Sequence, residues 1–196
     1  MLEKLNANVF VTYGGSLPDD YWLIQDRCTS LVEALESSKS DHNIVILTAG
    51  PNPDFYGSEA FKDRMSRDIV EELQFIGYLP IGYESNKVTL MKDDKKVYVV
   101  TTKDNHWGTP EQTDAMIREI YILSEIYSIE TIHVVITKEN IPQLKFVWNL
   151  FYHGSAKLEF SGKPSRDKRN LKYHLMEYLR MFNAFGYYAH IRRHHH

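Results

Sequence analysis

The chain has 196 residues, of which 43% are hydrophobic, 25% are charged and 13% are aromatic, and its formal net charge is -3. This composition is typical of one globular domain with a sizeable core. The sequence contains neither a run of about 20 apolar residues nor the apolar core of a signal peptide, which excludes a membrane-spanning class and predicts a soluble, cytoplasmic protein.

Charge is distributed unevenly along the chain. From Gly162 onward there are eight Lys or Arg residues and two acidic residues, so this region carries about +6 and the remainder about -9. We therefore expect an α/β domain over residues 1–160, followed by a basic linker and C-terminal helix over residues 161–193. The histidines at 194–196 are interpreted as the remnant of a purification tag.

The first half of the chain predicts two strands, each followed by a helix. Residues 8–13 are rich in β-branched and aromatic residues and stop at a glycine pair, which predicts a strand. Apolar residues at helical spacing follow to about Glu36 and predict a helix. Residues 43–57 begin as an apolar strand buried on both faces and continue as a loop of turn-forming residues. A helix is then expected from Ser58 to about Ile76.

The single cysteine, Cys28, falls on the apolar face of the first helix. We interpret it as a small buried core residue, the alternative being a nucleophile. One cysteine excludes an internal disulfide and a multi-cysteine zinc site, and it agrees with a reducing compartment.

The second half continues the alternation. Residues 79–83 contain Pro80 and Gly82, so they are expected to be irregular or an edge strand. A hairpin with a charged turn follows, and then a strand-to-helix loop leads to Thr109-Pro-Glu-Gln, a helix start whose apolar stripe extends to Tyr127. The remaining predicted elements are a strand at 132–136, a helix at 144–151, a strand at 157–160 and a tail helix from residue 171.

Strands alternating with helices in this way predict the α/β class, with a mainly parallel, mixed sheet. Helices should cover both faces of the sheet in a three-layer α/β/α arrangement, with a C-terminal helix added. Because crossover connections are right-handed, the loops after Tyr13, Thr48, Val100 and Ile136 should open on one edge of the sheet, which is where such folds bind ligands.

The candidate site residues come mostly from these loops. The residues expected to bind a ligand are Gly50, Asn52, Lys103, Trp107 and Thr137. Asp54 and His106 are the candidates for catalysis, because a carboxylate or an imidazole can activate water. The cluster from Lys103 to Trp107 has a structural alternative, in which Trp107 packs ahead of the Thr109 helix start.

Several site classes have no signal. The chain lacks the phosphate-loop and dinucleotide glycine motifs and the Gly-x-Ser-x-Gly nucleophile elbow, and its histidines show no metal-ligand spacing. His133 lies within an apolar strand and is interpreted as a core histidine. We expect no cofactor and no metal.

The basic region predicts a second kind of partner. Its cations, followed by aromatic residues, could contact nucleic acid or a protein partner; they are Lys163, Arg166, Lys168, Arg169 and Lys172. The alternative is a helix whose aromatic residues pack on the body of the protein or on a second subunit.

Residues 43–151 resemble macro domains of the kind found in phages and DNA-modification antitoxins. The resemblance rests on Val97 to Lys103, His106-Trp107, Pro110 and the strand Ile129 to Ile136. It implies a ligand related to ADP-ribose across the loops after Thr48 and Ile136, and a phage source. In both of these loops the family's glycine-rich stretch is replaced, in the first by Pro51 to Tyr56, so backbone N–H groups are lost at the prolines.

Two functions follow from these observations. The first is binding of a nucleotide-like or other anionic small ligand at the carboxyl edge of the sheet, with enzymatic activity left open. The alternative is a non-enzymatic protein that binds nucleic acid or a host protein through its basic region.

Overall fold

The computed structural model describes residues 4–13, 21–49, 64–84, 87–105 and 109–164, the helical segment 184–189, and residues 179 and 182. These residues form a mixed seven-stranded sheet in the order β3-β4-β5-β2-β1-β6-β7. The strands are β1 Leu5–Thr12, β2 His42–Ala49, β3 Leu79–Glu84, β4 Lys87–Lys92, β5 Lys95–Asn105, β6 Tyr127–Val135 and β7 Lys157–Ser161.

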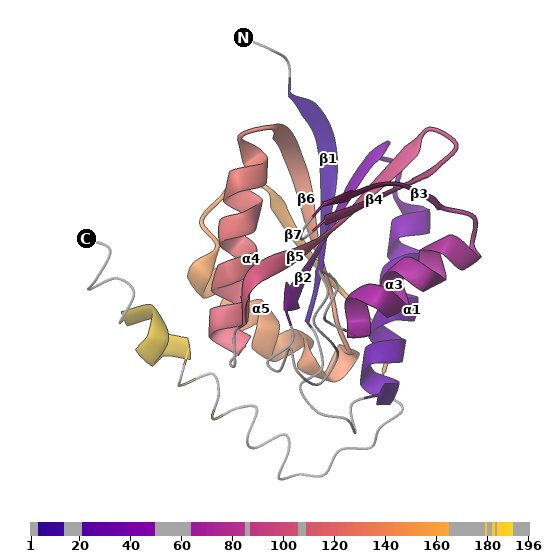
Figure 1. Cartoon of the computed structure of the whole chain (residues 1–196). Helices are drawn as coiled ribbons and strands as arrows, with labels where there is room; N and C mark the ends of the chain where they lie inside the picture. Colours follow the sequence, from indigo (N-terminus) through magenta and orange to yellow (C-terminus); the bar gives the residue numbers. More distant parts are fainter. Residues whose placement is uncertain are drawn as a thin grey trace.

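Helices cover both faces of this sheet, as the sequence predicts. They are α1 Tyr21–Ser37, α3 Arg64–Phe75, α4 Thr109–Ser124 and α5 Ile141–Phe151, with a short 3-10 helix, η2 Lys138–Asn140, ahead of α5. Figure 1 shows α1 and α3 on one side of the sheet and α4 and α5 on the other. The three-layer α/β/α class is therefore confirmed.

Alternation along the central strand β1 produces two separate hydrophobic cores. Val9 and Val11 face α4 and α5, whereas Phe10 faces α1 and α3, where Cys28 is buried with Leu31. Because both faces of the central strands are covered, these strands read as continuous apolar runs. The interpretation of Cys28 as a small core residue is confirmed, since it is 2% exposed.

The carboxyl end of α1 is held by a lysine that directly follows the turn between β4 and β5. Lys95, the first residue of β5, places its Nζ 2.8 Å from the carbonyl oxygen of Ser38 and 3.3 Å from that of Leu35. The last carbonyl groups of a helix have no partner within the helix, and a cation there also favours the helix dipole. Lys95 therefore stabilises the carboxyl end of α1.

Strands β5, β2, β1, β6 and β7 run parallel, and β3 and β4 form an antiparallel pair at one end. The carboxyl ends of the parallel strands consequently meet at one edge. This confirms the expectation that the chain leaves β1, β2, β5 and β6 on the same side of the molecule.

Two predicted boundaries are wrong. Tyr127 does not extend the helical stripe but begins β6, because it pairs with Leu5 at the amino end of β1. The strand β5 continues to Asn105, where it pairs with Ala49 of β2, so Lys103 belongs to a strand and not to a loop. In the described part of the chain, none of the helices combines the length and apolarity that crossing a bilayer requires.

Candidate functional site

The chain leaves β1 and β6 toward opposite faces of the sheet. The two strands are parallel neighbours, β1 leads to α1 on one face, and β6 leads to α5 on the other. Such a switch in direction opens a crevice above the carboxyl ends of the two strands, and α/β proteins commonly bind ligands there. The candidate site is therefore the carboxyl end of β1 and β6.

Buried polar side chains gather at this edge. They come from strand ends, from the first turns of α4 and α5, and from one arginine of α1; they are Thr12, Arg27, Thr101, Thr102, Gln112, Thr113, Thr137 and Gln143. Polar groups are costly to bury, so their concentration marks this edge as chemically different from the rest of the core. We call this set the carboxyl-edge polar cluster.

At the centre of the cluster, the hydroxyl group of Tyr13 links three elements. The indole Nε1 of Trp148 donates to it at 2.8 Å, and the hydroxyl lies 2.6 Å from Oγ1 of Thr113. Thr113 donates its own hydroxyl proton to the carbonyl oxygen of Thr109 at 2.7 Å. A threonine has one such proton, so Tyr13 must be the donor in its bond to Thr113.

Burial keeps the hydroxyl group of Tyr13 neutral. Burial raises the pKa of the Tyr13 hydroxyl well above its ordinary value, and the bonds with Thr113 and Trp148 and the charge of Arg27 lower it by less. A phenol with its proton committed to Thr113 is unsuited to proton transfer near neutral pH. Tyr13 therefore joins β1, α4 and α5 beneath the crevice.

Arg27 brings a positive charge to the end of β1. It is 6% exposed, and its Nη1 donates to the carbonyl oxygen of Tyr13 at 2.6 Å. A guanidinium presents several donors in a fixed plane, which suits carboxylate and phosphate groups. Arg27 is not among the site residues predicted from the sequence, although it lies four residues before Leu31, which is buried on the same helix.

The loop after β6 offers fewer free donors than a phosphate cradle needs. The N–H of Ile136 donates to the carbonyl oxygen of Ser161 at 2.9 Å, and that of Lys138 donates to Lys163 at 3.0 Å. Backbone hydrogen bonding between the β6 and β7 segments thus continues beyond the carboxyl ends of the two strands. Thr137, between these donors, is 2% exposed and its side chain makes no capping bond to η2.

Gly162 makes this continued pairing sterically possible. A Cβ atom at this position would fall on the carbonyl oxygen of Ile136. Only a residue without a side chain allows the backbones to approach so closely.

The buried polar atoms that have no hydrogen-bond partner among the described residues include one at the end of a strand and one in a helix of this cluster. These two are Oγ1 of Thr12, at the end of β1, and the side-chain nitrogen Nε2 of Gln143, in the first turn of α5. Buried polar groups are normally satisfied, so such atoms call for an explanation, which a bound ligand or water can supply.

Most of the predicted site residues lie outside the described part of the chain: Gly50, Asn52, Asp54, His106, Trp107, Arg166, Lys168, Arg169 and Lys172. The same holds for the side chain of Lys103, whose backbone belongs to β5. Thr137 lies within the carboxyl-edge polar cluster. Lys163 lies beside the loop after β6 and forms an ion pair with Glu33 of α1.

The described part of the C-terminal region packs on the body. Phe185 meets Phe146 of α5 with ring centroids 5.1 Å apart, Tyr188 meets Phe151 at 5.5 Å, and Ala184 is fully buried. For segment 184–189, the packing alternative is therefore confirmed. The aromatic rings of Tyr187 and Tyr188 are half-buried in this contact.

His133 is only partly a core residue. It is half-buried, stacks on Phe10 at 4.6 Å, and lies with Nδ1 3.2 Å from Oε2 of Glu159 on β7. Burial lowers the pKa of His133, with a smaller contribution from Lys157, while Glu159 raises it. The described residues include no group of three or more His, Cys, Asp or Glu side chains placed to hold a metal ion.

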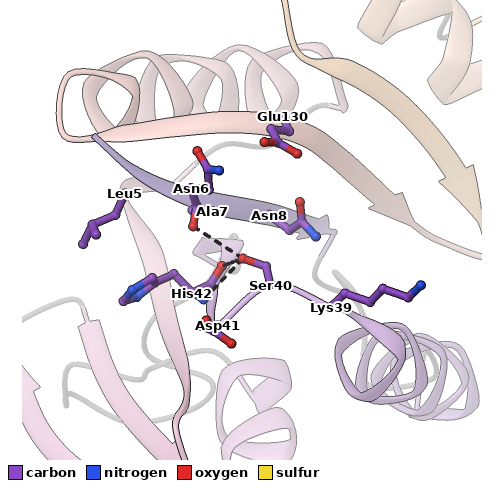
Figure 2. Close-up of a pocket in the computed structure, with 9 residues that line it drawn as sticks. All are labelled: Leu5, Asn6, Ala7, Asn8, Lys39, Ser40, Asp41, His42 and Glu130. Atoms are coloured by element: carbon purple, nitrogen blue, oxygen red, sulfur yellow. Dashed lines mark hydrogen bonds between the residues drawn. The ribbon is translucent and has the colours of Figure 1, made fainter. Parts of the chain in front are cut away.

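The opposite, amino edge of the sheet carries an open depression of about 450 Å³ (Figure 2). Among its lining residues, Ser40 donates its hydroxyl group to the carbonyl oxygen of His42 at 2.9 Å and accepts from the N–H of His42 at 3.3 Å. In Figure 2, Lys39, Asp41 and Glu130 point in different directions around the rim. The hydrogen bonds of Ser40 thus stabilise the connection from α1 to β2. The charged side chains of the rim do not converge on a ligand position.

Comparison of the chain with protein-family models, with curated proteins and with solved structures found no match. The resemblance to macro domains therefore stays a prediction.

Proposed function

We propose that the protein binds a nucleotide-like, anionic small ligand in the crevice above the carboxyl ends of β1 and β6. The observation that carries the proposal is the carboxyl-edge polar cluster with buried Arg27 at the point where β1 and β6 diverge. In an apolar surrounding, a guanidinium attracts an anion more strongly than it does in water.

Side chains, more than backbone groups, would have to recognise the ligand. The N–H groups of Ile136 and Lys138 are already committed, and Pro51 and Pro53 have none. Under this proposal Arg27 attracts the anion, and Gln143 and Thr12 offer polar atoms that have no partner among the described residues. ADP-ribose is the ligand that the macro-domain resemblance suggests.

Further proposed contacts come from the ends of β2 and β5. Asn52 and Lys103 would bind the ligand, Trp107 would stack on its ring, and Asp54 or His106 would activate water if the ligand is hydrolysed.

Thermal unfolding of the full chain tests the proposal. ADP-ribose, NAD, ADP and inorganic pyrophosphate should raise the unfolding temperature, whereas uncharged adenosine should have little effect. A ligand present at about 100 times its Kd stabilises the folded state by about 2.7 kcal/mol. Calorimetric titration should then show weaker binding by Arg27→Met, with Arg118→Met, which changes an exposed arginine of α4, as the matched control.

Failure of every anion to shift the unfolding temperature would contradict the proposal. If polynucleotides bind instead, with strong salt dependence that is lost when Arg166, Lys168 and Arg169 are replaced by glutamate, the basic region carries the function.

A further inference from the structure

The described part of the C-terminal helix has one side on the body of the protein and another side open to solvent. Its described residues, 179, 182 and 184–189, are helical. Ala184 is fully buried, whereas Leu179, Phe182 and Phe185 are 50%, 73% and 51% exposed. Large apolar side chains that gather on a surface usually mark a site of interaction.

The three exposed residues share one face of the helix. They follow one another at intervals of three positions, which keeps their side chains within about 120° of one another around the helix axis. Ala184 and Tyr188, which pack against the core beneath α4 and α5, lie on the opposite side. We call Leu179, Phe182 and Phe185 the C-terminal apolar stripe.

The stripe lies on the outermost layer of the molecule. Figure 1 shows the segment, in yellow, at the periphery, with α4 and α5 between it and the sheet. Phe185 contacts Phe146 of α5 with ring centroids 5.1 Å apart, so the stripe begins at the margin of the contact with the body. A single helix that projects an apolar face from the surface is suited to insertion between lipid headgroups, whereas a partner helix would need a groove.

The sequence around the stripe is strongly basic. Lys163 is paired with Glu33 of α1. Residues 164–193 include seven Lys or Arg residues and two acidic residues, a balance of about +5. This charge complements a surface of negative phosphate groups, and clusters of cations beside an amphipathic helix are typical of binding to anionic lipids.

Exposure alone does not distinguish the stripe, but its combination with positive charge does. Phe75 at the end of α3 is 87% exposed, yet it lies one helical turn after Glu71 and Glu72. Acidic neighbours are repelled by an anionic surface, and burying them with Phe75 would be costly. Phe75 therefore provides an exposed phenylalanine of the opposite electrostatic kind.

We propose that the C-terminal apolar stripe inserts into the headgroup region of a membrane surface that carries anionic phospholipids. The apolar side chains enter between the headgroups, and the phosphates attract the cations of the surrounding sequence, as in amphipathic helices that lie in the plane of a bilayer. The α/β domain stays in water. With three apolar side chains and a modest net charge, binding is weak and reversible and increases with the content of anionic lipid.

Co-sedimentation of the full chain with lipid vesicles tests this proposal. Vesicles of phosphatidylcholine with about 30% phosphatidylserine should bind the protein at least about tenfold more tightly than vesicles of phosphatidylcholine alone. Salt at about 0.5 M should weaken this binding strongly, because it screens exposed charges.

A pair of matched substitutions identifies the stripe as the inserted surface. Phe182→Ser should weaken binding to the anionic vesicles about tenfold, since it removes most of the apolar area of one inserted side chain. Phe75→Ser changes the more exposed phenylalanine on α3 and should leave the affinity unchanged. Circular dichroism checks that each variant is folded.

A fluorescent label gives an independent readout that does not depend on loss of binding. Cys28 is buried, so Phe182→Cys adds one accessible thiol for a polarity-sensitive dye. Its emission should shift to shorter wavelength when anionic vesicles are added, and the same dye on Phe75→Cys should not respond.

Three results would overturn the proposal. The first is the absence of binding to anionic vesicles, with or without binding to a polynucleotide. The second is an equal response of positions 75 and 182 in either experiment. The third is a dimer of the wild type that Phe182→Ser dissociates in the absence of vesicle binding, since a second copy of the chain would then cover the stripe.

Discussion

The hydroxyl group of Tyr13 both accepts and donates a hydrogen bond, and its partners lie on α5 and α4. Few side chains join three elements through a single atom. Because the proton of Thr113 is committed to Thr109, the direction of every bond in this chain is fixed. The arrangement makes Tyr13 a structural residue at the place where a functional one would be sought.

Replacing Tyr13 by phenylalanine should therefore destabilise the protein without changing its fold. The substitution leaves the buried Nε1 of Trp148 without an acceptor, which costs about 1–3 kcal/mol. Urea unfolding measures the change. Tyr121→Phe is the control, because Tyr121 is exposed and its hydroxyl accepts one bond from the N–H of His153, so its effect should be smaller. Equal destabilisation by both variants would contradict this account.

At the scale of elements, strand pairing decided the two boundaries that the sequence analysis placed wrongly. The apolar stripe of α4 continues to Tyr127 in the sequence, but Tyr127 pairs with Leu5, and this distant contact was invisible in a local pattern. The polar run from Lys103 to Asn105 reads as a loop, yet it belongs to β5, and its last residue pairs with Ala49 of β2. Long-range pairing here overrides local propensity.

Periodicity was sufficient for the fold class, because alternating strands and helices leave few topologies open. It also indicated that β1, β2, β5 and β6 end at one edge of the sheet. It did not indicate Arg27, since a polar residue within an apolar helical face is ordinarily expected at its margin. Only the observed burial shows that Arg27 reaches the end of β1.

The backbone hydrogen bonds that extend the β6–β7 pairing beyond the strand ends depend on Gly162. Gly162→Ala would force residues 161–163 away from β6, because the added Cβ meets the carbonyl group of Ile136. Losing the two backbone bonds made there should lower the free energy of unfolding by about 2–4 kcal/mol. Chemical denaturation checks the value, and Gly186→Ala is a matched control, since a Cβ there meets nothing within 4 Å.

Gly186 lies in a helical segment, where replacing glycine by alanine stabilises by about 0.5–1 kcal/mol. The two substitutions should thus have opposite signs. Destabilisation of similar size in both would mean that the close approach at Gly162 is not the cause.

At the scale of the whole molecule, the two cores cover the centre of the sheet more fully than its β7 end. His133 sits in this less covered region, and its pKa is lowered chiefly by burial. The unfolded chain therefore binds a proton more readily than the folded protein does. The stability that this histidine contributes is complete above about pH 6.5 and is lost as the pH falls below that value.

Free energies of unfolding measured at about pH 7.5 and pH 5.5 should show this loss. In His133→Phe the ring that stacks on Phe10 is kept and the titrating group is removed, so the fall between the two pH values should be smaller than in the wild type. An equal fall in both proteins would assign the pH dependence to other groups.

The central position of β1 also shapes how the chain folds as it is synthesised. β1 can pair with β2 soon after Ala49 has left the ribosome, but its other neighbour, β6, begins only at Tyr127. At a synthesis rate of about 5–20 residues per second, about 4–16 s pass between the synthesis of Ala49 and that of Tyr127. During this time β1 lacks its second neighbouring strand. Nascent chains of this protein are therefore expected to recruit chaperones during that interval, and slower translation between β2 and β6 should lower the yield of soluble protein.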